Sequence, residues 1–175
     1  SMWAVMMVAM MLPSAAPTIL LYARVLRRNF AQGRPALQVA AFLAGYVAVW
    51  TGFSLAATFA QWGLERTGVV SAAMASASGT ATGTLLIAAG LYQLTPLKDV
   101  CLAHCRSPID FLMRRWRKGT AGALAMGLGH GVYCLGCCWA LMLLLFAGGV
   151  MNLVIIAALT LYVLIEKLAP GGTRV

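Results

Sequence analysis

The sequence predicts an all-α protein, a polytopic bundle of about five transmembrane helices with one short amphipathic helix at the membrane surface. Hydrophobic residues make up 62% of the 175 positions and charged residues only 10%, whereas a soluble domain usually carries about a quarter charged residues. Five apolar stretches approach the ~20 residues that a spanning helix needs, and none shows the apolar/polar alternation of a membrane β-barrel strand. They cover residues 2–23, 37–62, 72–95, 121–147 and 150–168.

The basic residues between these stretches indicate how the chain crosses the bilayer. The gaps after the first and third stretches are rich in Arg and Lys, the other two gaps carry one Arg between them, and the tail is basic again. The positive-inside rule therefore places both basic gaps and the C-terminus in the cytoplasm, and the N-terminus outside. Because the net charge of +9 follows this topology, it does not indicate a nucleic-acid partner; the expected surroundings are a lipid bilayer.

We expect one membrane domain over residues 1–175, without a soluble domain. The chain opens Ser1-Met2, so residues preceding it in the full protein are expected to be missing. Residues 109–118 place Phe111, Leu112 and Trp116 among basic side chains. This pattern predicts the surface amphipathic helix, with a plain basic loop as the alternative.

Glycines at four-residue spacing indicate where helices approach each other closely. Gly79 with Gly83, and Gly127 with Gly131, form two GxxxG patterns, which let the backbones of membrane helices come together. We expect both pairs to face a neighbouring helix, within the chain or in an oligomer.

Two clusters of metal-binding side chains precede the strongest one. Met6 and Met10 lie one turn apart in the first stretch, so their thioethers share a helix face, although methionine is also an ordinary core residue. Cys101, His104 and Cys105 follow the third stretch, and the two cysteines share a face if this segment is helical. Structural disulfides are rare in the cytoplasm, so thiolate chemistry or metal binding is the more natural use of these cysteines.

The strongest cluster is the run from His130 to Cys138. Cys134, Cys137 and Cys138 lie within five positions, and His130 precedes Cys134 by one turn. Met126, His130, Cys134, Cys138 and Met142 succeed one another in steps of four, which traces a slowly winding ridge on a helix. Thiolate, imidazole and thioether together suit Cu(I) or, less well, Zn(II). The pattern favours a metal or redox site over chance packing.

The motifs together resemble a bacterial family described as predicted metal-binding integral membrane proteins. The resemblance spans nearly the whole chain and rests on four segments: the Met-rich start with Pro13 and Pro17, the segment around Cys101 and Cys105, the segment around Cys134 to Cys138, and Glu166-Lys167. It implies a multi-pass protein of the bacterial inner membrane in which the cysteines and methionines belong to one pattern.

Simple helix geometry argues against a single five-cysteine site. If the fourth stretch crosses the membrane from Gly119, Cys134 lies ~21 Å along it at 1.5 Å per residue. Cys101 and Cys105 would stay at the cytoplasmic edge, so we expect two separate thiol sites unless residues 119–130 leave the bilayer core.

Three functions remain open. The first is binding or relay of a soft ion, most simply Cu(I), between a donor and an acceptor protein, without turnover of an organic substrate. The second is a membrane thiol–disulfide relay that uses the cysteine pairs. The third is a structural subunit of a larger membrane complex or homo-oligomer, in which the cysteines only pack.

Overall fold

The computed structural model describes residues 2–29, 34–66, 79–148 and 152–168, and throughout this part of the chain the regular structure is helical. The all-α prediction is therefore confirmed. Seven helices occur in these ranges: α1 Met2–Asn29, α2 Pro35–Arg66, α3 Gly79–Gln93, α4 Pro96–Arg106, α5 Pro108–Arg115, α6 Gly119–Gly148 and α7 Leu153–Leu168.

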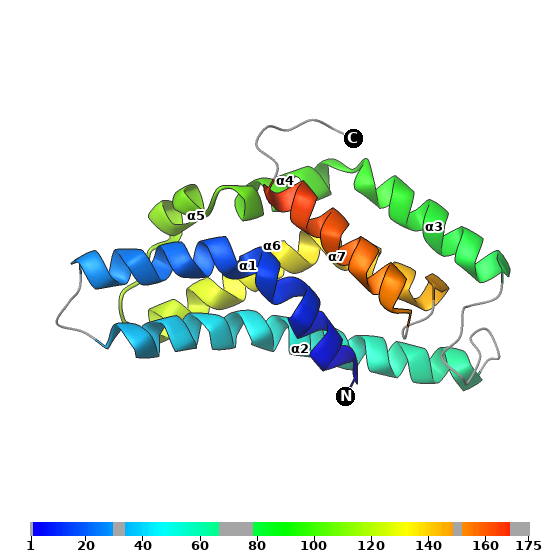
Figure 1. Cartoon of the computed structure of the whole chain (residues 1–175), viewed down its shortest axis with the longest axis horizontal. Helices are drawn as coiled ribbons and strands as arrows, with labels where there is room; N and C mark the ends of the chain where they lie inside the picture. The colour runs from blue at the N-terminus through cyan, green and yellow to red at the C-terminus, as the bar shows by residue number, and fades with distance from the viewer. Residues whose placement is uncertain (1, 30–33, 67–78, 149–151, 169–175) are drawn as a thin grey trace.

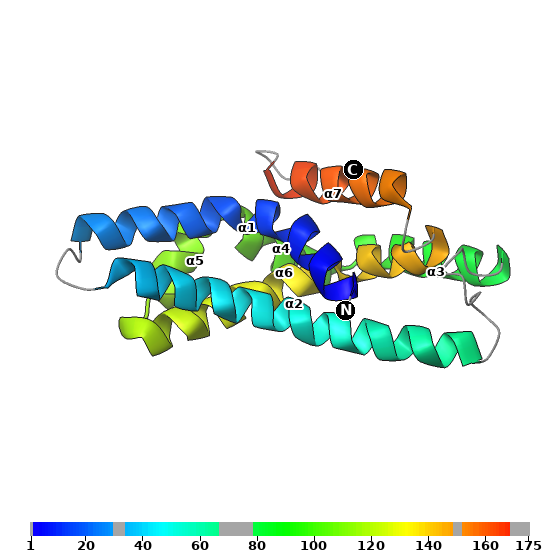
Figure 2. The same cartoon turned by 60° about the horizontal axis from the view of Figure 1, so that its bottom comes forward.

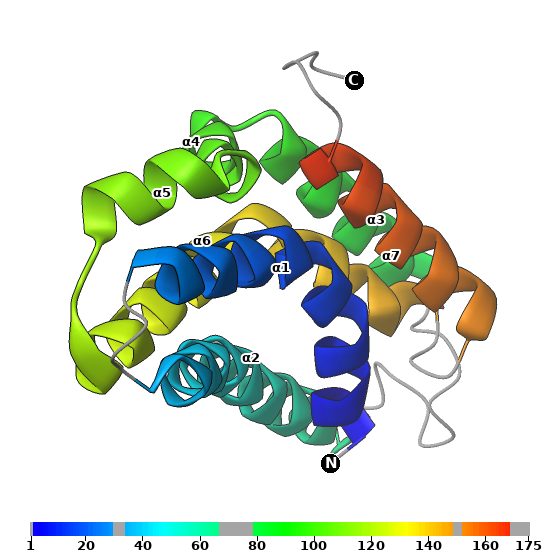
Figure 3. The same ribbon diagram turned by 60° about the vertical axis from the view of Figure 1, so that its left-hand side comes forward.

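The long helices α1, α2 and α6 lie side by side along the long axis of the molecule (Figures 1 and 2). The most extensive packing is between α2 and α6. The short helices α4 and α5 run along one side of this group, and α7 lies across α1, α4 and α6 (Figure 3). Helix α1 bends in its middle, where it contains Pro13 and Pro17; proline removes a backbone donor and kinks a helix.

Glycine sets the crossing of α2 and α6. A Cβ atom on Gly127 would collide with the backbone carbonyl of Phe42, and one on Gly45 would collide with the carbonyl of Leu124. The expected close approach at Gly127 is thus confirmed. Gly79 and Gly83 make no such approach in the described part of the chain, because a Cβ at either position meets no described atom within 4 Å. A close approach at these two glycines in an oligomer stays a prediction. Glycine spacing permits a close approach, but the position of the neighbouring helix decides which pair is used.

Three of the described helices are long and apolar enough to cross a membrane, namely α1, α2 and α6. Helices α3 and α4 add a fourth crossing if they count as one span, although they are bent by 66° at the break before Pro96. The predicted fifth span corresponds to α7, which has 16 described residues, fewer than the ~20 of an ordinary span. The predicted third span begins at residues 72–78, which lie outside the described residues.

The segment after the third stretch contains two helices. Helix α5 buries Phe111 and Leu112 and exposes Arg114 and Arg115, so the amphipathic helix predicted at residues 109–118 is present at residues 108–115. Helix α4, which carries Cys101 and Cys105, begins with a proline in its first turn, and proline is favoured there because that backbone donor is unused.

The interior divides into two hydrophobic cores. The first, here called the sulfur core, joins α1, α2, α4, α6 and α7. It contains Met6, Met7, Met10, Met11, Cys134, Cys137, Cys138 and Met142. The second, here called the aromatic core, lies where α5 covers α1, α2 and α6, and it is centred on Tyr22, Phe42 and Phe111.

Candidate copper site

The ridge that the sequence predicted on α6, here called the sulfur ridge, faces the interior of the molecule. Each of its five members is no more than 2% exposed. They are Met126, His130, Cys134, Cys138 and Met142. Successive members climb the helix by ~6 Å, at 1.5 Å per residue. The ridge therefore forms a row of soft donor atoms that runs through the protein and is closed off from the surroundings.

Cys134 lies at the centre of the candidate site. Lys167 on α7 donates from its Nζ to the Cys134 Sγ at 2.9 Å, and the hydroxyl of Tyr46 lies 3.1 Å from the same sulfur. Cys105, Cys137 and Cys138 belong to the same core as Cys134. Two helices besides α6, namely α2 and α7, thus bring polar groups to this one sulfur atom.

Cys138 adds a thioether to the cluster. Its Sγ lies 3.9 Å from the Met11 Sδ and 2.8 Å from the backbone carbonyl oxygen of Cys134. The carbonyl of Met11 accepts hydrogen bonds from Tyr46 and from Ser14. The bond from Tyr46 holds the bent part of α1 against α2, whereas the bond from Ser14 lies within α1. Together they fix the backbone at Met11, whose side chain lies beside Cys138.

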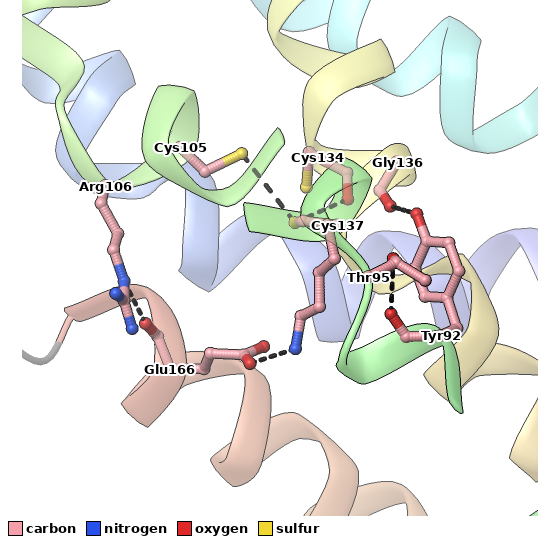
Figure 4. Close-up of polar contacts among 9 residues, drawn as sticks. Tyr92, Thr95, Cys105, Arg106, Cys134, Gly136, Cys137 and Glu166 are labelled. Atoms are coloured by element: carbon pink, nitrogen blue, oxygen red, sulfur yellow. Dashed lines mark hydrogen bonds and ion pairs between the residues drawn. The ribbon is translucent and has the colours of Figure 1, made fainter. Parts of the chain in front are cut away.

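Cys105 on α4 joins the same cluster. The Cys137 Sγ lies 4.0 Å from the Cys105 Sγ, a contact that Figure 4 shows between α6 and α4. Cys101, one turn earlier, packs on Gly136, where a Cβ atom would come within 2.7 Å of its sulfur. Gly136 therefore allows α4 to approach the cysteines of α6.

The expectation of two separate thiol sites is wrong, because α4 does not stay at the end of the bundle. The chain bends by 66° between α3 and α4, and α4 packs along α6. Tyr92, at the end of α3, donates from its hydroxyl to the Gly136 carbonyl and fixes the approach (Figure 4). Cys134 lies near the middle of α6, and a single site is possible because α4 reaches the same part of that helix.

Ionic contacts fasten α4 to α7 beside the cysteines. Lys98 pairs with Glu166, and the Arg106 guanidinium donates from Nε to the Glu166 carbonyl at 2.7 Å (Figure 4). Lys98 is only 2% exposed, and a buried charge normally requires such a partner. Because Glu166 is held toward α4, the adjacent Lys167 is presented to Cys134.

The remaining predicted ligands occupy different environments. Met6 and Met10 are buried in the sulfur core on α1. His130 is surrounded by the rings of Phe42, Tyr46 and Phe111, and its Nδ1 has no hydrogen-bond partner among the described residues.

His104 is not brought to the cysteines. Its ring stacks on that of Tyr133 with centroids 4.2 Å apart, and its Nδ1 lies 2.9 Å from the Val100 carbonyl oxygen. Tyr133 in turn accepts a hydrogen bond from Arg115.

The sulfurs are gathered but are not arranged as a rigid closed metal site. Among the described residues, no three Cys, His, Asp or Glu side chains are already placed around a common ion position. The Met11 thioether adds a further soft donor, 3.9 Å from the Cys138 sulfur. Copper(I) is satisfied by two or three soft ligands, so two thiolates and one thioether fit it after small side-chain movements.

Three residues at the cluster were not among the ligands predicted from the sequence: Met11, Tyr46 and Lys167. Met11 follows the predicted Met10 but lies on the face toward α6. Lys167 did carry a signal, because an ionisable residue in an apolar helix is a functional candidate by default. The sequence left open that it was an anchor at the membrane surface. No sequence signal distinguished Tyr46 from other tyrosines.

The class of protein follows from these features: an all-helical protein with long apolar helices that buries a thiol and thioether cluster suited to a soft metal ion. The model of the family PpoB2, described as a copper chaperone, matches residues 1–175. This chain therefore belongs to the PpoB2 copper chaperone family. Neither the curated proteins nor the solved structures contain a match to it.

Proposed function

We propose that this protein binds Cu(I) within the membrane and relays it between a donor and an acceptor protein. Cys134, Cys138 and Met11 are the principal ligands, and Cys137 and Cys105 receive the ion in turn. The observation that carries the proposal is the convergence of sulfur atoms from α1, α4 and α6 on one buried place. Soft thiolate and thioether donors favour Cu(I), and the family description names copper. Nothing comparable supports zinc.

A relay needs neighbouring sulfurs that can exchange one ion. The Met11–Cys138 and Cys105–Cys137 pairs are separated by 3.9 and 4.0 Å, so an ion can bond to the next sulfur before it leaves the last. Exposure increases along this series, from Cys138, which is buried, to Cys105, which is half-buried. Copper bound at Cys138 can therefore reach the side of α4, where a partner protein gains access to it.

The membrane arrangement belongs to the same proposal. Helices α1, α2 and α6 cross the bilayer, α3 with α4 and α7 supply the fourth and fifth crossings, and α5 lies at the inner surface. The protein resides in the bacterial inner membrane with its C-terminus in the cytoplasm, as the distribution of basic residues favours. Single-cysteine labelling in residues 24–34 and 114–118 tests this topology, because labelling from opposite sides contradicts it.

Copper binding is tested with a double variant, Cys134→Ser together with Cys138→Ser, in detergent or nanodiscs. We expect it to lose most of the Cu(I) that the parent retains in competition with a chromogenic Cu(I) chelator. Cys101→Ser, which leaves these ligands intact, is the matched control and should retain the parent stoichiometry. A double variant that retains as much copper as the parent refutes the proposal.

The pH dependence of affinity is a second property of thiolate ligands. Copper replaces the thiol protons, so uptake releases protons and the apparent affinity falls as the pH is lowered. The same chelator competition, repeated from pH 8 down to about pH 6, measures this fall. An affinity independent of pH would exclude thiols as the ligands.

One observation favours a second candidate, a thiol–disulfide relay. The Cys105 and Cys137 sulfurs lie 4.0 Å apart. Thiol–disulfide exchange with a disulfide of a partner protein would join them at ~2.0 Å, and the partner's disulfide would leave as two thiols that take up the electrons and protons of the pair. Alkylation before and after mild oxidation distinguishes the candidates. A reversible Cys105–Cys137 disulfide in a protein that does not bind copper would favour the thiol–disulfide relay.

A further inference from the structure

Lys167 is placed unlike an ordinary anchor residue at the end of a membrane helix. Such lysines extend the ammonium toward water, but Lys167 is only 7% exposed and turns inward. Its Nζ donates to the Cys134 Sγ at 2.9 Å and to the Ser14 Oγ at 3.0 Å. A buried ammonium is therefore in direct contact with a sulfur atom of the candidate copper site.

The carboxylate next to Lys167 in the sequence is paired with another lysine and does not neutralise the Lys167 ammonium. Glu166, the acidic residue next to it in sequence, pairs with Lys98 on α4. Arg106 also contacts α7 through the Glu166 carbonyl. The remaining contacts of Lys167 are a neutral hydroxyl and a thiol. Among the described residues, the Lys167 ammonium is therefore the positively charged group within hydrogen-bond distance of the Cys134 sulfur, where a bound metal ion would add its charge.

We propose that Lys167 determines the specificity of the site, because its ammonium balances a two-thiolate site that holds one monovalent ion and disfavours divalent ions. This inference rests on the proposed function. On binding, the thiols of Cys134 and Cys138 release their protons to solvent and bond to the ion as thiolates. Met11 adds a neutral donor, and Lys167 remains beside the sulfurs as the counter-ion.

The charges of the possible complexes explain the selectivity. Two thiolates and Cu(I) carry one net negative charge, which the Lys167 ammonium neutralises. Two thiolates and Zn(II) are already neutral, so the same ammonium leaves one positive charge uncompensated. An uncompensated charge in a buried, low-dielectric site is unfavourable. The ammonium therefore strengthens the binding of a monovalent ion and weakens that of a divalent ion at the same ligands.

The test compares the affinities of Cu(I) and Zn(II) for the purified, metal-free protein at one fixed pH, each by competition with a chromogenic chelator. Lys167→Gln removes the charge but keeps a hydrogen-bond donor for Ser14. We expect its Cu(I) affinity to fall by about a hundredfold, as when one partner of a buried charged pair is removed, and its Zn(II) affinity to rise. Lys167→Arg keeps the charge and should keep the preference for Cu(I).

Opposite shifts for the two ions separate the charge effect from damage to the fold, which would weaken both. Lys118→Met, an exposed position between α5 and α6, removes one positive charge away from the sulfurs and should leave the affinity ratio unchanged. A Lys167→Gln protein whose Cu(I) to Zn(II) ratio stays within about threefold of the parent overturns the inference, as does a parallel fall of both affinities.

The Cys134→Ser and Cys138→Ser double variant, measured in the same series, tests the copper site separately from the role of Lys167. Loss of copper in this variant together with an unchanged ratio in Lys167→Gln would contradict the role of Lys167 alone. Full retention of copper in the double variant would contradict the proposed copper site itself.

Discussion

The two cores of this protein are similarly buried but differ in what they surround. In the sulfur core, thiols and thioethers lie beside polar groups that come from separate helices, namely Tyr46, Ser14 and Lys167. In the aromatic core, aromatic rings pack on one another. The centroid of the Tyr22 ring lies 5.2 Å from that of Phe42 and 5.5 Å from that of Trp116. The buried Tyr22 hydroxyl finds no hydrogen-bond partner among the described residues.

This difference indicates a division of labour along α6. One helix contributes Met126 to the aromatic core and Cys134, Cys138 and Met142 to the sulfur core. His130 lies between them, with its ring near Phe111 on one side and Tyr46 on the other. We interpret the aromatic core as the part that holds α5 and the ends of α1 and α2 together, and the sulfur core as the part that binds copper. Separate changes in the two cores should therefore affect separate properties.

The largest effect on stability is expected in the aromatic core. Phe111 is 2% exposed and packs beside His130 and Tyr133. Phe111→Ala should lower the free energy of unfolding by about 3 kcal/mol, because it removes a buried ring and leaves a cavity, while the folded protein keeps its copper stoichiometry. Phe59→Ala, at a position on α2 that is 70% exposed, is the matched control. If fully folded Phe111→Ala protein bound less copper than the parent, the two cores would not have separate roles.

The converse effect is expected at Met11. Leucine has nearly the volume of methionine, so Met11→Leu should change stability by less than about 1.5 kcal/mol. It should nevertheless weaken Cu(I) binding by about tenfold, because the thioether beside Cys138 is lost. Met6→Leu and Met10→Leu should weaken binding only modestly. Met7→Leu, equally buried on the same helix, serves as the control, and chelator competition with thermal unfolding measures both properties. Equal effects at Met7 and Met11 would show that Met11 is not a ligand.

The smallest effect is expected at His104. Its ring is engaged by Tyr133 and its Nδ1 by a backbone carbonyl, so His104→Gln should retain the copper stoichiometry and bind Cu(I) within about threefold of the parent. Its cost in stability should be no more than about 1 kcal/mol, since an aromatic stacking contact is lost. A loss of one bound copper per chain would return His104 to the ligand set.

The helices predicted from the sequence agree well with the structure, but the predicted contacts between helices agree less well. The span predicted at residues 37–62 corresponds to α2, and that at 121–147 corresponds to α6. The helical periodicity also predicted the α6 ridge, and the structure shows that all five of its members are buried. Gly79 and Gly83 meet no other helix in the described part of the chain, and the predicted separation of Cys101 and Cys105 from the other cysteines is wrong. Both findings concern which helix lies next to which.

The sequence alone determined the helical class, the copper-suited donors and the face on which Cys134 and Cys138 lie. These properties depend on composition and on a period of 3.6 residues, which are local. Only the tertiary structure decided that α4 packs on α6 and brings Cys105 to Cys137, that Met11 meets Cys138, and that Lys167 turns inward to Cys134. The first contact depends on the bend before Pro96, the second on the bond from Tyr46 to Met11, and the third on the Lys98–Glu166 pair. No local pattern specifies such contacts, because each joins residues that are distant in the chain.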